Sequence, residues 1–158
     1  MKKIKVISSI ITIMIMALIF FFSSQTANVS HETSSGIAMK FAQMISRMIN
    51  YSDAESIYKS IHTLVRKTAH FSLYAMLGVS VANTAFWLLP WRRMRLFLIS
   101  LAFSVCYAIS DEVHQIFVPG RAGMIGDVII DTCGALCGIL LFLCVLRIYK
   151  RCCKTDFD

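Results

Sequence analysis

Acidic residues are scarce in this chain, which has nine Asp and Glu against 16 Lys and Arg among its 158 residues. An excess of basic residues is common in nucleic-acid-binding proteins, but here they form short runs at the ends of apolar segments. That placement is typical of membrane topology, in which basic runs mark the cytoplasmic side. We therefore expect a membrane protein with no nucleic-acid partner.

The sequence also lacks an ordered cysteine pattern. None of the spacings between its six cysteines matches a zinc knuckle, and no cysteine falls between residues 25 and 65. Cysteines inside apolar runs usually behave as small hydrophobic residues. We expect no disulfide framework and no metal site formed by these cysteines, and no residue pattern identifies a cofactor.

Charge is nearly absent from four long stretches, and 57% of all residues are hydrophobic. Soluble domains are only about 45–50% apolar, and about 20 apolar residues suffice to cross a bilayer. We predict a single all-α integral membrane domain over residues 1–158. Its four transmembrane helices are expected at about 6–24, 68–89, 95–116 and 127–147.

The first apolar stretch also resembles a signal peptide, because it follows a basic N-terminus and precedes a passable cleavage site at residues 24–27. Its length favours an uncleaved first span. Residues 25–65 then form an outer loop. Apolar residues recur there at three- and four-residue spacing, which predicts an amphipathic helix on the membrane surface. A break near residues 50–53 predicts a second short helix after it.

The basic runs decide the predicted orientation. With four spans, all of them fall on one side of the membrane, which is then the cytoplasm. They are Lys2, Lys3, Lys5, Arg92, Arg93, Arg95, Arg147, Lys150, Arg151 and Lys154. Three or five spans would separate one run from the others. Both termini are therefore expected inside, and the 25–65 loop and the connection near residue 120 outside.

The stretch Ser110–Asp127, SDEVHQIFVPGRAGMIGD, gathers ionisable residues between two apolar runs. At a rise of about 1.5 Å per residue, Asp111 lies about 22 Å above Leu96 and Asp131 about 24 Å above Arg147. Both carboxylates therefore lie at nearly one level in the outer third of a core about 30 Å thick. His70 reaches the outer boundary of the second span. Ionisable groups at this depth are a functional-site hypothesis.

Helical spacing groups the ionisable residues further, because residues three or four apart share a helix face. The resulting sets are Arg66, His70 and Tyr74; Asp111, His114 and Gln115; and Asp127 and Asp131. Glu112 points elsewhere, toward another partner helix. A Pro-Gly turn at 119–120 brings Arg121 back over the cluster. Asp127 has an equal alternative as a first-turn residue that complements the helix dipole.

Three kinds of site remain open. A histidine tuned by a carboxylate, with an arginine that holds an anion, would serve proton-transfer or nucleophilic catalysis. His and Asp residues would also suit a metal. Buried ion pairs, such as Arg66–Asp111 or Arg121–Asp131, would instead lock the bundle around a binding pocket. The catalytic candidates are His114, Asp111, Glu112 and His70. The candidates for substrate binding are Arg66, Gln115, Arg121, Asp127, Asp131, Tyr74 and Gln25.

Three sequence blocks carry a resemblance to a known family. RKTAHFSLYAMLG (66–78), SDEVHQIFVPGRAGMIGDVIIDTCGA (110–135) and FSSQ (22–25) resemble the signatures of the VanZ-like membrane proteins. Leu73 stands where many relatives have a glutamate. The resemblance implies a bacterial cell membrane and, for the family's namesake, low-level resistance to the glycopeptide antibiotic teicoplanin.

Together, these observations lead to two hypotheses for the function. The first is a hydrolase or transferase that acts on a membrane lipid or lipid-linked amphiphile at the extracellular face. The second is a non-catalytic scaffold that binds or excludes such an amphiphile. The sequence leaves the oligomeric state open.

Overall fold

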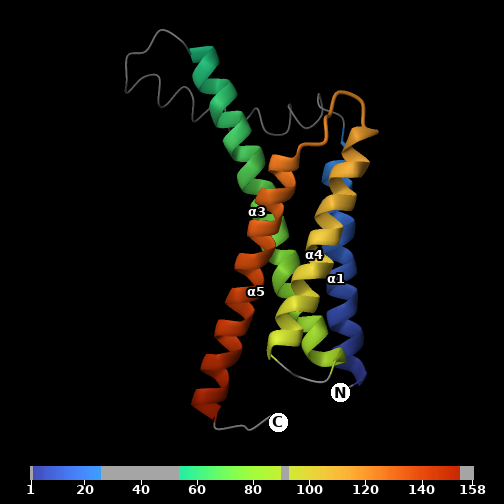
Figure 1. Cartoon of the computed structure of the whole chain (residues 1–158), viewed down its shortest axis with the longest axis vertical. Coiled ribbons are helices and arrows are strands. Elements are labelled where there is room, and N and C mark those ends of the chain that lie inside the picture. The colour runs from blue at the N-terminus through green and yellow to red at the C-terminus, as the bar shows by residue number, and fades with distance from the viewer. Residues whose placement is uncertain (1, 26–53, 90–92, 154–158) are drawn as a thin grey trace.

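The computed structural model describes residues 2–25, 54–89 and 93–153 (Figure 1). These residues form four helices and no strand. The helices are α1 (Lys2–Ser23), α3 (Ala54–Leu88), α4 (Arg93–Ile116) and α5 (Ile125–Cys153). The all-α prediction is therefore confirmed for the part of the chain that the structure describes.

All four helices are long and apolar enough to cross a membrane. The segments that meet this description are Lys2–Ser23, Thr63–Leu88, Arg93–Ile116 and Ile125–Cys152. They agree with the four predicted spans to within a few residues. Large apolar side chains are exposed along the helices, among them Ile13, Met14, Leu98 and Leu141. Such faces suit contact with lipid tails, and the chain has the character of a multi-pass membrane protein.

The polar segment before the second span is helical and is continuous with the span. We expected a second short helix after residues 50–53, and α3 begins at Ala54 and continues to Leu88 as one helix of 35 residues. No proline interrupts this segment, so the polar first part can join the apolar second part without a break. At about 1.5 Å per residue, α3 is about 52 Å long and exceeds the hydrocarbon core. The predicted amphipathic helix before residue 50 lies outside the described residues.

α3 lies at the centre of the bundle and makes its most extensive contacts with α5. Glycine makes this close approach possible. A Cβ atom at Gly134 would collide with the carbonyl of Phe71, and one at Gly138 would collide with the carbonyl of Ala75. Gly134 and Gly138 are four residues apart, a spacing typical of close helix packing, and backbone here lies directly against backbone.

Polar side chains join α1 to α3 away from the loop between α4 and α5. The Thr12 hydroxyl lies 2.8 Å from the Ser80 hydroxyl and 2.9 Å from that of Thr84. The Asn83 amide donates to the Ser8 hydroxyl over 3.1 Å. Hydrogen bonds of this kind hold helices together where lipid offers no polar partner.

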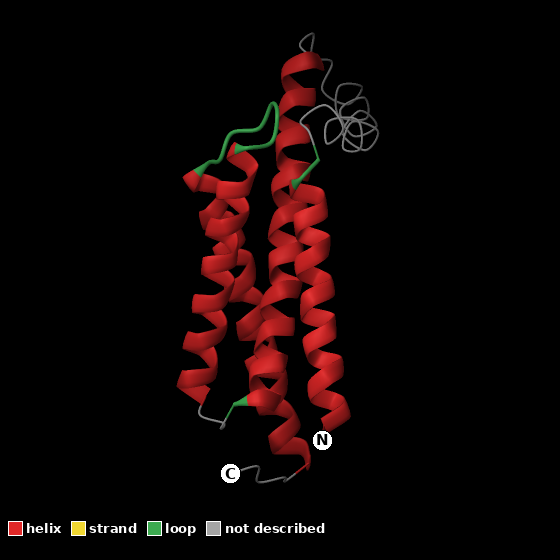
Figure 2. Cartoon of the chain, turned by 90° about the vertical axis from the view of Figure 1, so that its right-hand side faces the viewer, coloured by secondary structure: helices red, strands yellow, loops and turns green. Residues whose placement is uncertain are grey.

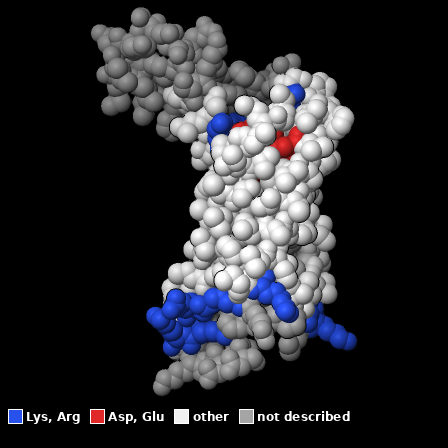
Figure 3. Space-filling view, in the orientation of Figure 1, with Lys and Arg blue, Asp and Glu red and all other residues white. Residues whose placement is uncertain are grey.

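The two ends of the bundle differ in charge. The start of α1 and the end of α5 lie at the same end of the bundle, and the loop between α4 and α5 lies at the other (Figures 1 and 2). Lys and Arg side chains gather around the first end (Figure 3). The acidic side chains visible on this face lie near the opposite end, together with a few basic ones.

Candidate functional site

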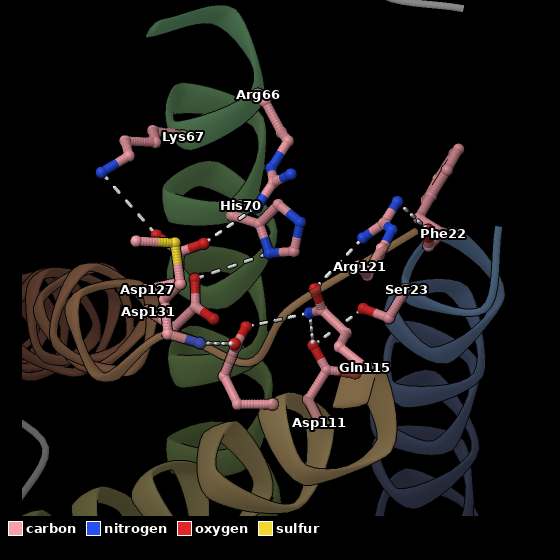
Figure 4. Close-up of polar contacts among 12 residues, drawn as sticks. Phe22, Ser23, Arg66, Lys67, His70, Asp111, Gln115, Arg121, Asp127 and Asp131 are labelled. Atoms are coloured by element: carbon pink, nitrogen blue, oxygen red, sulfur yellow. Dashed lines mark hydrogen bonds and ion pairs between the residues drawn. The ribbon is translucent and has the colours of Figure 1, made fainter. Parts of the chain in front are cut away.

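Polar side chains from all four helices meet at the end of the bundle that carries the α4–α5 loop (Figure 4). We call this set the polar layer. Its members are Ser23 of α1; Arg66, Lys67, His70 and Tyr74 of α3; Asp111, Glu112 and Gln115 of α4; Arg121 of the loop; and Asp127 and Asp131 of α5. Residues up to 108 positions apart in sequence thus lie within one short section of the bundle.

Gln115 connects the α4 part of the layer. Its amide nitrogen lies 3.3 Å from Asp111 Oδ2 and 2.9 Å from Glu112 Oε1, and donates to both carboxylates. Asp111 also accepts a 2.8 Å hydrogen bond from the Ser23 hydroxyl of α1. Asp111, Glu112 and Gln115 are all buried. The helical spacing therefore predicted correctly that Asp111 and Gln115 face the same way.

Glu112 belongs to the layer as well, with its side chain beside Gln115. Its second carboxylate oxygen accepts a 2.9 Å hydrogen bond from the backbone N–H of Met124, just before α5 begins. We expected Glu112 to face another helix; it contacts Met124, the loop residue directly before α5. Because both oxygens have partners, Glu112 fastens the loop to α4.

The loop returns over the layer through a tight turn at Pro119-Gly120. Gly120 has a φ of 78°, in the left-handed region that favours glycine. Arg121 then donates to Gln115 Oε1 over 3.2 Å and to the backbone carbonyl of Phe22 over 3.3 Å. The predicted position of Arg121 above the cluster is observed. Its suggested ion pair with Asp131 is wrong, because the guanidinium faces Gln115 and the end of α1.

Ion pairs join α3 to α5 at the exposed edge of the layer. Arg66 lies 3.0 Å from Asp127 Oδ2, and Lys67 lies 3.7 Å from Asp127 Oδ1. The suggested Arg66–Asp111 pair is therefore wrong, because Asp127 lies nearer on the facing helix. Asp127 remains in the first turn of α5, as its alternative interpretation required.

His70 and Asp131 face each other deeper between the same two helices. His70 Nδ1 lies 3.7 Å from Asp131 Oδ1, which is too far for a hydrogen bond. Asp131 is fully buried, and neither of its carboxylate oxygens has a hydrogen-bond partner. The Tyr74 hydroxyl and Asp111 Oδ1 are buried without partners too. Buried polar groups are normally satisfied, so these atoms need an explanation.

With this geometry in view, the comparison with known families is informative. The family model described as VanZ/LLP1 matches residues 9–147. The chain belongs to the VanZ/LLP1 family. The match includes most of α1 and α5, all of α3 and α4, and the whole polar layer, and it confirms the resemblance seen in the sequence. No curated protein and no solved structure matches the chain.

Two predicted site residues of this VanZ/LLP1 protein lie apart from the hydrogen-bonded network. The His114 ring stacks on Phe20 of α1 at 4.6 Å between centroids, and its buried Nε2 has no partner among the described atoms. Gln25 lies just beyond the end of α1 and is half-buried. Among the described residues, no hydrogen bond or ion pair joins it to the layer. The structure thus brings His70, rather than His114, to the carboxylates.

The sequence alone missed four members of the network. Ser23 lies in the FSSQ block but was not assigned a role, and the Phe22 carbonyl and Met124 N–H are backbone groups that no sequence pattern marks. Lys67 was not among the site candidates, yet its ammonium lies 3.7 Å from Asp127 Oδ1. The FSSQ block is the one signal that would have pointed to Ser23.

The layer combines two chemical capacities. Arg66 and Arg121 offer guanidinium donors for an anion such as phosphate. His70, Asp111 and Asp131 offer an imidazole and carboxylates, which transfer protons, activate water or bind cations. Both sets of groups lie at the same level of the bundle (Figure 4).

Proposed function

We propose that this family member acts on the anionic polar head of a membrane lipid or lipid-linked amphiphile, as a hydrolase or transferase. The observation that carries the proposal is the convergence of His70, Asp111 and Asp131, whose buried atoms lack partners, from three helices. Ionisable groups buried inside a membrane domain are a functional-site hypothesis by default. We call these three side chains the reacting centre.

Two arginines support binding of an anion beside the reacting centre. Burial and, secondly, the nearby Arg66 guanidinium lower the pKa of Arg121 from its ordinary value. Its buried Nε has no hydrogen-bond partner among the described residues. An anion between the two guanidiniums would relieve their repulsion and accept the free donor, and phosphate suits arginine geometry.

The charge distribution supports a site at the outer face of a bacterial cell membrane. Basic side chains gather at the end of the bundle opposite the layer (Figure 3), and basic ends usually remain in the cytoplasm. The layer would then open to the outer leaflet. Action on a lipid-bearing envelope component there fits the glycopeptide resistance that the VanZ-like resemblance implies, and resistance is part of this proposal.

The first test compares lipid extracts from cells that produce the wild type, His70→Ala or Ser72→Ala. Ser72 is exposed on the same helix, and its hydroxyl bonds only to the Thr68 carbonyl. We expect His70→Ala to remove the lipid species that wild-type expression creates, or to restore the one that it consumes. Ser72→Ala should behave as the wild type, because it leaves the reacting centre intact.

Membrane abundance of each variant is measured by immunoblot, so that loss of protein is separated from loss of reaction. If cells that contain His70→Ala in the same amount as the wild type show the wild-type lipid profile, the proposed reaction is overturned.

Binding without reaction is the second candidate, and the environment of Glu112 favours it. Both Glu112 oxygens are held by Gln115 and Met124, as expected for a fixed pocket wall rather than a proton-transfer group. A binder would tolerate Asp111→Glu and lose affinity gradually over many positions. An enzyme would lose turnover completely at a few positions.

A further inference from the structure

We infer that His70, Asp111 and Asp131 bind one divalent transition-metal cation of the zinc or manganese class. One ligand atom from each residue lies within 4.8 Å of the other two. The three side chains come from α3, α4 and α5, so the ion would connect three helices. A role of the cation in catalysis rests on the function proposed above. Binding of the cation does not, because it can be measured without any reaction.

The vacant atoms of these side chains are the first argument for a cation. His70 Nδ1, Asp111 Oδ1 and both Asp131 oxygens are buried and have no hydrogen-bond partner. Asp131 is 0% exposed and Asp111 is 3% exposed. A buried carboxylate with two vacant oxygens is costly unless it is neutralised or coordinated. A metal ion supplies the missing partner to all three side chains together.

The charge balance of the layer is the second argument. Arg66 and Lys67 pair with Asp127, and the Arg121 guanidinium faces Gln115 and Phe22. Among the described residues, no Lys or Arg forms an ion pair with Asp111 or Asp131. A divalent cation would neutralise these two buried carboxylates without a further side chain.

The separation of the ligand atoms fits a site without its ion. His70 Nδ1 and Asp131 Oδ1 are 3.7 Å apart, too far for a hydrogen bond but suitable for two ligands of one ion. Ligand bonds of about 2.0–2.2 Å at tetrahedral angles hold two ligand atoms about 3.3–3.6 Å apart. The His70–Asp131 pair is already close to this spacing, and the other separations, which are within 4.8 Å, need to close by about 1 Å at most. Nitrogen and oxygen donors suit zinc or manganese, and three protein ligands leave a position for water.

The sequence left a metal site of His and Asp ligands open but assigned no residue to it. The three ligands lie on separate helices at positions 70, 111 and 131, so no short spacing motif marks them. Helix packing is what brings them together.

The test uses the full-length protein purified in detergent. Its metal content is measured by elemental mass spectrometry, and its thermal midpoint is then measured after chelation and after addition of ZnCl₂ or MnCl₂. We expect close to one equivalent of metal per chain. At 100-fold excess over Kd, metal should raise the thermal midpoint by about 5 °C or more. No bound metal and no response to either salt would overturn the inference.

Asp131→Asn and Asp127→Asn form a matched pair on the same helix. Asp131 faces the ion, whereas Asp127 binds Arg66 and Lys67. We expect Asp131→Asn to lose bound metal at least tenfold and to lose the thermal response, while Asp127→Asn keeps both. Equal metal content in the two variants would contradict the assigned ligands. If Asp131→Asn fails to fold, the chelation measurement on the wild type still decides.

The two proposals fail in different ways. Metal binding without any lipid change would leave the cation site standing and overturn the reaction. Lipid turnover by a metal-free protein, persisting in the presence of chelator, would leave the reaction standing and overturn the cation site.

Discussion

Ser23 and Ser24 are neighbours at the end of α1 with contrasting surroundings. The buried Ser23 hydroxyl donates to Asp111 on α4, whereas the exposed Ser24 hydroxyl bonds back to the Phe21 carbonyl. We expect Ser23→Ala to lower the free energy of unfolding by about 1–3 kcal/mol, because it removes a donor from a buried carboxylate. Ser24→Ala should change it by less than about 0.5 kcal/mol.

Thermal unfolding of both serine variants in the same detergent measures this difference. Equal midpoints for the two variants would show that the Ser23–Asp111 contact adds no stability. The pair also tests whether α1 is coupled to the polar layer.

At the residue scale, the sequence predicted most members of the layer but few of its pairings. Spacing on one helix brought Asp111 and Gln115 together, and it placed Arg66 and His70 on one face of α3, where both meet carboxylates of α5. It could not choose among partners on different helices. Asp127 and Asp111 were both candidate partners for Arg66, and only the close α3–α5 packing decides that Arg66 meets Asp127. His114 shares the spacing of the layer but stacks on Phe20.

At the scale of the element, the contact between α3 and α5 depends on glycine. A methyl group at Gly138 would meet backbone atoms of Ala75 and Val79, whereas one at Gly126 would meet nothing within 4 Å. We expect Gly138→Ala to destabilise the fold by about 1–3 kcal/mol, as overpacking does. Gly126→Ala should be neutral or slightly stabilising, because alanine has the higher helix propensity.

Denaturant or thermal unfolding of both glycine variants is the appropriate measurement. If Gly138→Ala is as stable as Gly126→Ala, α3 and α5 can move apart without loss of stability.

Helix positions were predictable because apolar runs of about 20 residues have few alternatives in a chain of this composition. The continuity of α3 was not predictable in the same way. Its first part is polar, and hydropathy marks the apolar segment rather than the helix that extends beyond it. The sequence therefore predicted a separate short helix after residues 50–53, whereas the backbone continues from it into the span.

At the scale of the whole molecule, the asymmetry of charge predicts one orientation. The basic residues near the starts of α1 and α4 and the end of α5 lie opposite the polar layer (Figure 3). By the positive-inside rule, both termini should lie in the cytoplasm. A fluorescent protein fused to the C-terminus should therefore be bright in bacterial cells, and an alkaline phosphatase fusion at that position should be inactive.

The reverse pattern, a dark fluorescent fusion and an active phosphatase, would place the polar layer on the cytoplasmic side. A phosphatase inserted in the loop after Gly120 is the internal control, because it should report the opposite side of the membrane. Immunoblots of each fusion exclude differences in expression.

The backbone contact between α3 and α5 gives the polar layer one stiff wall. Gly134 lies against the Phe71 carbonyl, one residue from His70 and three from Asp131. Side chains change rotamer readily, but two backbones in direct contact have little play. Asp111 on the opposite side is held through Ser23 and Gln115, both of which are side-chain contacts. The α3–α5 side of the polar layer is therefore held by backbone packing, and Asp111 on the other side is held by side-chain hydrogen bonds. We expect any movement that lets a bound molecule enter or leave the layer to be made by α1 and α4.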